Sequence, residues 1–459
     1  MIKNGLGIAA LCLVSACVTQ PGEMRLPGPQ QHALPHGQTF PARDYWWRAL
    51  NDTQLNQYVE TALYSAPSLR SAQARFAQLG ADLGVLDASG KLQVGLGAEG
   101  VGVLLSKRPP SEFAESDRSL LVAHAAAQAK WSFDFWGKNR AQIQAALGRR
   151  NALYYETRQT EILLANTVAV QYFSWQGLEA QKAVLNRRID NAKQIEKLLQ
   201  SRVGAQLAAP SAVYPAQQAQ RQFELQKLQL DKEIARILHG LDVLSGRPPV
   251  PLNIRKPAAM APVPDVKTDG LKADLLGRRP DIAAQRALLA MRSHNIRAAK
   301  ADFYPNVELR LLAGLSHIDA FDLVRSNSGM LGIVPAVNLP IFTSGALRSN
   351  LAKRRGEYEE QIAIYDQTVL DAMRAAADAL SDYRNLMAQY EAALGLQAAA
   401  EKSAASMLRR ANAGLEHKTL YYQKQDEVLQ QQALVSAKHA EVLAAWSNLH
   451  AQLGGGFQE

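Results

Sequence analysis

Apolar residues recur every three, four or seven positions along the last quarter of the chain, and no proline interrupts residues 344–459. This spacing predicts one sustained helix. Residues 138–202 are also free of proline and show the same spacing, which predicts a second helix. Each of these two long helices is expected to cover about 65 residues, or about 100 Å at 1.5 Å per residue, before the chain turns back. The segments 211–244 and 415–453 are expected to return antiparallel to them, which gives two coiled hairpins.

A different period marks four shorter segments, at residues 91–105, 120–134, 307–317 and 330–340. Apolar and polar residues alternate there with period two, although glycine and alanine weaken the pattern, so these segments are predicted strands. Arg108-Pro109-Pro110 and the residues 326–329 mark a turn within each pair. Weak alternating segments of about ten residues are typical of transmembrane β-barrels.

The two halves of the chain follow one plan, so we infer an internal two-fold repeat. The residues that follow Pro67 match those that follow Pro280 at an offset of 213 positions, and at that offset Val94-Gly95-Leu96 meets Val307-Glu308-Leu309. Each half therefore reads as helix, strand pair, long helix, turn and return helix. A proline-rich segment at residues 247–264 joins them.

Four strands cannot close a barrel, and lipid does not tolerate open sheet edges. Because known barrels begin at eight strands, the chain must oligomerise, giving eight strands in a dimer or twelve in a trimer. A ring of twelve helices about 10 Å apart leaves a lumen of about 28 Å, whereas eight helices leave about 15 Å. A trimer therefore suits a conduit for whole molecules.

Composition narrows the classes further. The chain has 459 residues, of which 47% are hydrophobic and 20% charged. This excludes a disordered chain, and no internal run approaches the roughly 20 apolar residues that a spanning helix needs. Two cysteines exclude a disulfide scaffold and a multi-cysteine zinc site.

The N-terminus has the form of a secretory signal. Lys3 precedes a short apolar run, and small residues then lead to Cys17. This end resembles a bacterial lipobox, which implies cleavage before Cys17 and a covalent lipid (palmitate among its acyl chains) on that residue. The alternative is an ordinary signal cleaved nearby. Val18 stands where inner-membrane retention would require aspartate, so the outer membrane is expected.

The net charge of +9 does not indicate a nucleic-acid partner, because the basic residues are dispersed along helices with acidic residues between them. Nor does the chain contain a recognisable catalytic motif. Its nine histidines are scattered, without His-Glu-x-x-His, Gly-x-Ser-x-Gly or a Cys–His pairing. We therefore expect no enzyme and no cofactor other than the lipid on Cys17.

Several motifs together resemble the TolC-like outer-membrane factors, in particular their lipoprotein branch. They are Tyr45-Trp46-Trp47-Arg48-Ala49-Leu50-Asn51-Asp52, Leu275-Leu276-Gly277-Arg278-Arg279-Pro280-Asp281-Ile282, Pro340-Ile341-Phe342-Thr343-Ser344-Gly345 and Leu453-Gly454-Gly455-Gly456. The resemblance implies a mixed α and β fold: a trimeric 12-stranded transmembrane β-barrel with four strands per chain, continued by a long periplasmic α-helical barrel with an equatorial collar.

This resemblance also implies a function, namely the outer-membrane exit channel of a tripartite efflux pump for drugs or toxic compounds. Its partners would be two further copies, a periplasmic adaptor, an inner-membrane pump and outer-membrane lipids. Residues 133–140 look like the corresponding segment of family members that are paired with major-facilitator pumps. A resistance-nodulation pump as the partner is the alternative. The alternative is a periplasmic adaptor lipoprotein, against which two hairpins and four strands argue.

The chain is accordingly expected to divide as follows: signal peptide 1–16, lipidated N-terminal equatorial segment 17–66, first repeat 67–245 (strand pair 91–134, hairpin 138–245), linker and equatorial segment 246–279, second repeat 280–453 (strand pair 307–340, hairpin 345–453) and tail 454–459.

Candidate residues follow from the motifs. Pro280 falls where a helix begins, where its missing N–H costs little, and Asp281 favours the positive helix end. Arg278 and Arg279 are expected to tie this turn to the collar rather than to bind substrate. Trp136 and Phe342 fall between strand and long helix, which fits either a membrane interface or simple packing at a bend.

The far ends of the hairpins carry the remaining candidates. The resemblance implies that Arg202, Gly204, Arg410 and Gly414 meet the adaptor, and glycine there lets backbones approach closely or reverse. The alternative is a glycine that only ends a helix. Where the family places an aspartate ring, this chain has Gln423 or Lys424, directly after Tyr421 and Tyr422, so we expect a gate of tyrosines and amides.

Overall fold

The computed structural model describes residues 45–104, 119–249, 256–264, 279–317, 323 and 328–455. These residues form two compact units. The first comprises Phe76–Ala152 and Gln285–Ile364, and the second comprises Gln31–Arg75, Leu153–Ala284 and Tyr365–Glu459, as far as each is described.

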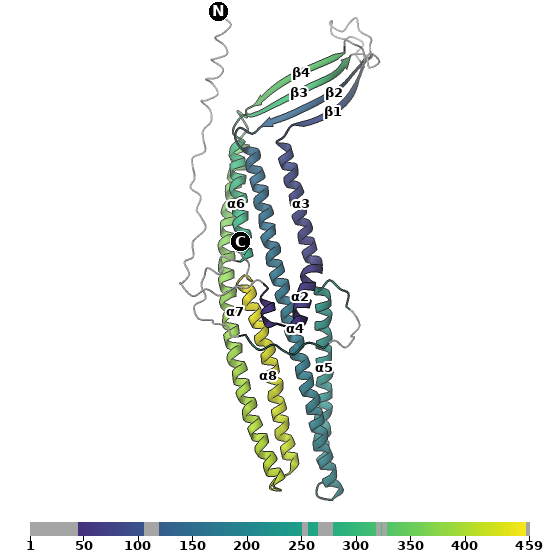
Figure 1. Cartoon of the computed structure of the whole chain (residues 1–459). Helices are drawn as coiled ribbons and strands as arrows, with labels where there is room; N and C mark the ends of the chain where they lie inside the picture. The colour runs from purple at the N-terminus through teal and green to yellow at the C-terminus, as the bar shows by residue number, and fades with distance from the viewer. Residues whose placement is uncertain are drawn as a thin grey trace, which may run out of the picture. The chain divides into compact units, whose positions relative to one another are not determined.

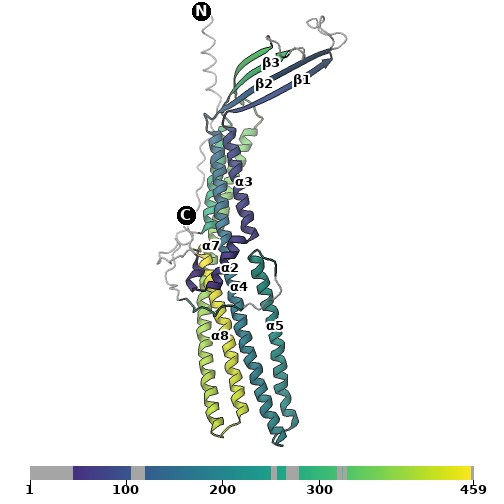
Figure 2. The same cartoon turned by 45° about the vertical axis from the view of Figure 1, so that its right-hand side comes forward.

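Helices dominate the chain (Figures 1 and 2). Their bounds are η1 Trp46–Leu50, α2 Thr53–Ser65, α3 Pro67–Ser89, α4 Lys138–Gly204, η3 Pro210–Val213, α5 Tyr214–Leu244, α6 Pro280–Ala301, α7 Ala346–Asn412 and α8 Lys418–Gln452. The helices α4 and α7 have 67 residues each, which confirms the two long helices that the apolar spacing predicts. The short elements η1 and α2 were not predicted, although Leu55, Val59 and Ala62 of α2 have helical spacing.

The first unit contains a four-stranded antiparallel sheet in the order β1-β2-β3-β4, drawn as four arrows in Figure 1. The strands are β1 Gln93–Leu104, β2 Ser119–Phe133, β3 Asn306–His317 and β4 Gly329–Asn338. Each pairs with the next without a bulge in the register, and β2 pairs with β3 although 172 residues separate their ends. All four predicted strands are therefore present, with ends shifted by a few residues at most.

In the second unit, α5 lies beside α4, and α8 lies beside α7 (Figures 1 and 2). Helices α4 and α8 also touch. A Cβ added at Gly177 of α4 would lie 2.6 Å from the Cβ of Ala440 of α8, so glycine is what permits this close approach. The predicted antiparallel hairpins are thus confirmed, and the two hairpins pack on each other.

The largest apolar core also belongs to the second unit. It joins η1, α2, α4, α5, α7 and α8, and its most deeply buried large side chains include Trp46, Tyr172, Phe173, Trp175 and Leu443. Full burial of such a side chain contributes about 1.5–3 kcal/mol. The N-terminal segment is therefore held by the same core that holds the helices together.

Candidate functional site

The sheet has one apolar and one polar face, because successive side chains in a strand point to opposite sides. The register sets the following residues on the apolar face: Val94, Leu96, Ala98, Ala125, Ala127, Ala129, Trp131, Phe133, Val307, Leu309, Leu311, Ala313, Leu315, Leu331, Ile333, Pro335 and Val337. Leu96 and Leu331 are 85% and 82% exposed in the single chain. An apolar surface of this extent requires lipid or a partner to cover it.

The opposite face carries polar and charged side chains: Gln93, Glu99, His124, Gln128, Lys130, Ser132, Asn306, Glu308, Arg310, Ser316 and Asn338. Glu308 lies at the centre of a cluster, with its carboxylate oxygens 3.3 Å from Lys130 Nζ, 3.0 Å from Arg310 Nη2 and 3.1 Å from Asn306 Nδ2. Such a face is suited to a water-filled lumen. The sequence prediction did not single out these charges, although Val307-Glu308-Leu309-Arg310-Leu311 contains the alternation that marks them.

Aromatic side chains follow the apolar face to the junction of β2 and α4. Phe133 packs against Trp131 and Phe135, with ring centroids 4.4 Å and 5.5 Å apart. Trp136 stacks on Tyr304 at 4.6 Å and donates from Nε1 to the carbonyl oxygen of Pro305 at 2.9 Å. Trp136 thus packs at the bend and is still half-exposed, whereas Phe342 at the other junction is 87% exposed.

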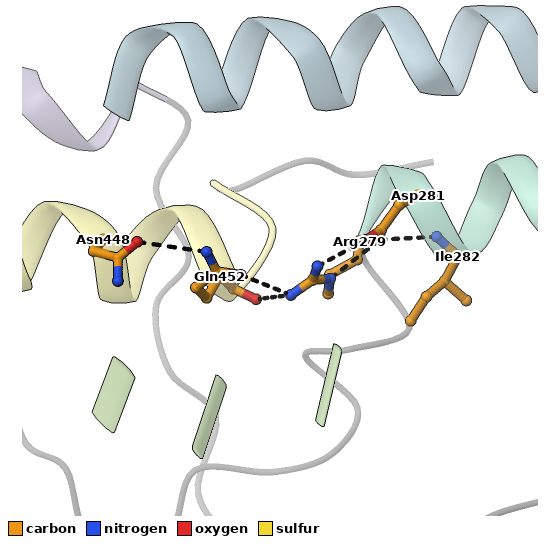
Figure 3. A network of polar contacts seen from close by, with 5 residues as sticks. All are labelled: Arg279, Asp281, Ile282, Asn448 and Gln452. Carbon is orange, nitrogen blue, oxygen red and sulfur yellow. Dashed lines mark hydrogen bonds and ion pairs between the residues drawn. The ribbon is translucent and has the colours of Figure 1, made fainter. Parts of the chain in front are cut away.

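Arg279 joins the beginning of α6 to the end of α8 (Figure 3). It is 6% exposed, and its Nη2 and Nε lie 2.7 Å and 3.1 Å from the carboxylate of Asp281. Its Nη1 donates to the backbone carbonyl of Gln452 at 2.8 Å. That carbonyl belongs to the last turn of α8, where helix geometry supplies no partner. Asp281 also accepts from the backbone N–H of Ile282, and Pro280 is the first residue of α6. Arg278 lies outside the described residues.

A second buried polar network ties the N-terminal segment to α4. Asp52 caps α2 by accepting from the N–H groups of Gln54 and Leu55, both at 3.0 Å. Its other carboxylate oxygen accepts from the Tyr172 hydroxyl at 2.9 Å and from Gln176 Nε2 at 3.2 Å. Burial, and then the charge of Asp52, raise the pKa of Tyr172, so the phenol stays protonated and donates. This site was not predicted from the sequence, although an aspartate directly before a helix is a typical capping signal.

The hairpin tips contain one correction. At the second tip Gly414 has φ +71°, as predicted for a reversing glycine. At the first tip Gly204 is still part of α4, and Gln206 takes the left-handed conformation with φ +57°. Both helices end in the same hydrogen-bonded motif, in which Leu207 N donates to Arg202 O and Leu415 N donates to Arg410 O. In this motif the left-handed residue lies four positions after the arginine, which is Gln206 at the first tip. The prediction that Gly204 reverses the backbone was therefore wrong.

Near these tips, α8 is tied to α4. Arg188 of α4 forms a bidentate ion pair with Asp426 of α8, at 2.9 Å and 2.8 Å, and its guanidinium lies 4.2 Å from the ring centre of Phe223 on α5. Asn191 donates to the backbone carbonyl of Tyr422 at 2.7 Å. No sequence signal identified Arg188 or Asn191, because their partners lie more than 230 positions away.

The four predicted gate residues all lie in the first turns of α8. The rings of Tyr421 and Tyr422 are 5.2 Å apart. Lys424 pairs with Glu427 on its own helix at 2.7 Å, and Gln423 is exposed. Among these four, the structure brings only Tyr422 into a hydrogen bond with α4.

In the described part of the chain, no three His, Cys, Asp or Glu side chains are grouped so that they would hold a metal ion. None of the described helices combines the length and apolar character needed to cross a membrane.

Comparison with known proteins identifies the class. The family model for outer membrane efflux proteins matches residues 58–247 and 271–455. The multidrug resistance outer membrane protein MdtP of Escherichia coli K12 is 28% identical over 375 residues, covering 78% of this chain and 76% of that protein. MdtQ of Escherichia coli O6:H1, also described as a multidrug resistance outer membrane protein, is 28% identical over 426 residues and covers 90% and 88%.

Solved structures agree in fold. The outer membrane protein VceC of Vibrio cholerae has a TM-score of 0.81 and 25% identity, and the match covers 91% of this chain and all of that one. The open MtrE outer membrane channel of Neisseria gonorrhoeae has a TM-score of 0.79 at 19% identity, covering 94% and 98%. The chain belongs to the outer membrane efflux protein family. It is an outer-membrane efflux channel protein, and both the predicted fold class and the predicted function are confirmed.

The apolar face of the sheet is accordingly the face toward lipid, and two neighbouring leucines test this. Leu311 lies on the apolar face and Leu312 on the polar face, both at the middle of β3. A charge facing lipid at the bilayer midplane costs about 2–4 kcal/mol, whereas a charge facing the lumen costs little. Leu311→Lys should therefore greatly reduce the folded channel recovered from outer membranes, and Leu312→Lys should not. The measurement is the amount of heat-resistant oligomer per cell, and equal loss in both variants would contradict the assignment.

Proposed function

We propose that three copies of this chain form the exit channel of a tripartite efflux pump. One observation carries the proposal: the sheet has a lipid-facing side, and β1 and β4 are its open edges. Because unpaired strand edges do not persist in lipid, the edges must be closed by other copies. Three copies supply twelve strands from four per chain, together with a lumen lined by the polar faces.

Adaptor binding is assigned to the hairpin tips. Arg202 and Arg410 lie in the last turns of the two long helices, and Leu207 and Leu415 close to them are each 69% exposed. Exposed leucines next to arginines provide an apolar contact surface with a charged rim. Such a surface suits the binding of a periplasmic adaptor protein. The energy for transport comes from an inner-membrane pump, of the major-facilitator or resistance-nodulation type. The channel itself needs no catalytic residues and no cofactor.

The cargo class is drugs and other toxic amphiphilic compounds, which the multidrug resistance relatives support. Deleting the gene should increase sensitivity to several such compounds, and the wild-type gene should restore resistance. A panel of minimum inhibitory concentrations measures this, with the Leu311→Lys gene as a control that supplies the protein without a folded channel. Unchanged sensitivity to every compound after deletion would overturn the efflux role.

A covalent lipid on Cys17 completes the proposal and anchors the N-terminus in the outer membrane. Cys17 lies outside the described residues, so the proposal depends on the small residues before it and on Val18 after it. Mass spectrometry of the mature N-terminus should find a diacylglyceryl group and an amide-linked acyl chain on Cys17. A mature chain that begins elsewhere with a free thiol would overturn it.

The gate is assigned to the first turns of α8, including Tyr421, Tyr422, Gln423 and Lys424. The ion pair between Arg188 and Asp426 holds these turns against α4. Both side chains are partly buried, at 18% and 28% exposure, and a bidentate pair in such a place is stronger than a pair at the open surface. We propose that this pair restrains the hairpins from separating.

Removing the pair should therefore favour the open channel. Arg188→Gln or Asp426→Asn should raise single-channel conductance in planar bilayers several-fold, and the exchange Arg188→Asp with Asp426→Arg should restore most of the restraint. Lys438→Gln provides the matched control, because it removes a pair with Glu441 that is confined to α8 and lies outside the gate. Conductance that stays at the wild-type level in the single variants would contradict this gate.

A further inference from the structure

A pocket of about 410 Å³ lies between the beginning of α4 and the end of α6. Its lining includes Trp136, Tyr304, His294 and the basic residues Arg140, Arg297 and Lys300. Three of these residues are permanent cations, and none is acidic. All of them belong to the first unit.

The acids near this pocket reach only one of its three cations, since Asp134 Oδ2 lies 3.6 Å from Arg140 Nε. Asp134 and Asp302 line a neighbouring cavity and not this one. Asp302 pairs with Lys138 at 2.7 Å, while Asp134 accepts from the N–H groups of Asn139 and Arg140. Among the described residues, no acidic side chain pairs with Arg297 or Lys300. Burial, and then the charge of Arg297, lower the pKa of His294.

Trp136 and Tyr304 separate the two cavities. The neighbouring cavity includes Ser132, Asn306 and Asn338, which belong to the lumen-facing side of the sheet. The basic pocket shares Trp136, Ala301 and Tyr304 with that cavity but contains none of the lumen-facing strand residues. The basic pocket contains no residue of the sheet, so it lies on the helical side of this aromatic pair.

Its depth fits the headgroup region. Trp136 follows Phe133, the last lipid-facing residue of β2, by three positions, and Arg297 precedes the end of α6 by four. At 1.5 Å per helical residue, Arg297 lies about 6 Å below the junction of helix and strand. Tryptophan and tyrosine at such a place are typical of the membrane–water interface.

We propose that this pocket binds the phosphate headgroup of an anionic phospholipid in the periplasmic leaflet of the outer membrane. The guanidinium groups of Arg140 and Arg297 match the oxygens of a phosphodiester, and Lys300 adds a third charge. The aromatic pair supplies a surface for the glycerol and the first carbons of the acyl chains. The first N–H groups of α4 are capped by Asp134, so the cationic side chains are what hold the phosphate. The inference uses the membrane position of the sheet and not the adaptor or the pump.

The experiment measures lipid binding to the purified full-length channel. Native mass spectrometry in detergent counts phosphatidylglycerol and phosphatidylcholine molecules retained on the wild-type protein and on the double variant Arg297→Gln, Lys300→Gln. Wild type should retain phosphatidylglycerol selectively. The double variant should bind it at least roughly tenfold more weakly, since basic residues near the surface dominate such binding. Added salt should weaken the wild-type interaction.

Two further variants separate the site from general charge. Arg348→Gln with Lys353→Gln removes one arginine and one lysine exposed elsewhere in the same unit, and should leave lipid binding unchanged. Arg297→Lys with Lys300→Arg keeps the charge and should retain most of the binding, which excludes simple misfolding as the cause of a loss.

Inorganic phosphate distinguishes the headgroup from free phosphate. If the lipid is the ligand, excess inorganic phosphate should not displace phosphatidylglycerol beyond the effect of the same ionic strength of chloride. Full displacement by phosphate, equal retention of phosphatidylcholine, or equal phosphatidylglycerol binding by wild type and the Arg297→Gln, Lys300→Gln variant would each overturn the proposal.

Discussion

The unpaired edges of the four-stranded sheet are the constraint on which the rest of this protein depends. Lipid offers no hydrogen bonds to the free N–H and C=O groups of β1 and β4, so a single chain cannot be stable there. Closure by further copies satisfies those groups and at the same time turns the polar faces inward. The lumen charges around Glu308 are tolerated only because this closure gives them water.

Long-range polar contacts hold the helical part in register. The buried carboxylate of Asp52 binds Tyr172, and Arg279 binds the end of α8, in each case across more than 100 positions of sequence. Arg188 and Asp426 add a third link near the tips. A buried ion that loses its partner is costly, so these links select one packing of the helices over its alternatives.

Periodicity was sufficient to predict most of the architecture. The long helices, their return helices and all four strands follow from spacing alone, because a period of three to four or of two is a local property. The choice of Gly204 as the reversing residue failed for a related reason: glycine permits a left-handed backbone, but the hydrogen bonds at the end of the helix decide which residue adopts it. At that tip the residue is Gln206.

Patterns among neighbouring residues and short motifs were thus enough to predict the long helices, the strands, the repeat and the class of protein. Which side chains meet depends instead on how distant segments pack. The register of β2 on β3 gathers Lys130, Glu308 and Arg310, and the packing of α4 against α6 gathers Arg140, Arg297 and Lys300. Each of these groups of charged side chains combines segments more than 150 positions apart. The local sequence pattern does not indicate which parts of two helices or strands will lie side by side.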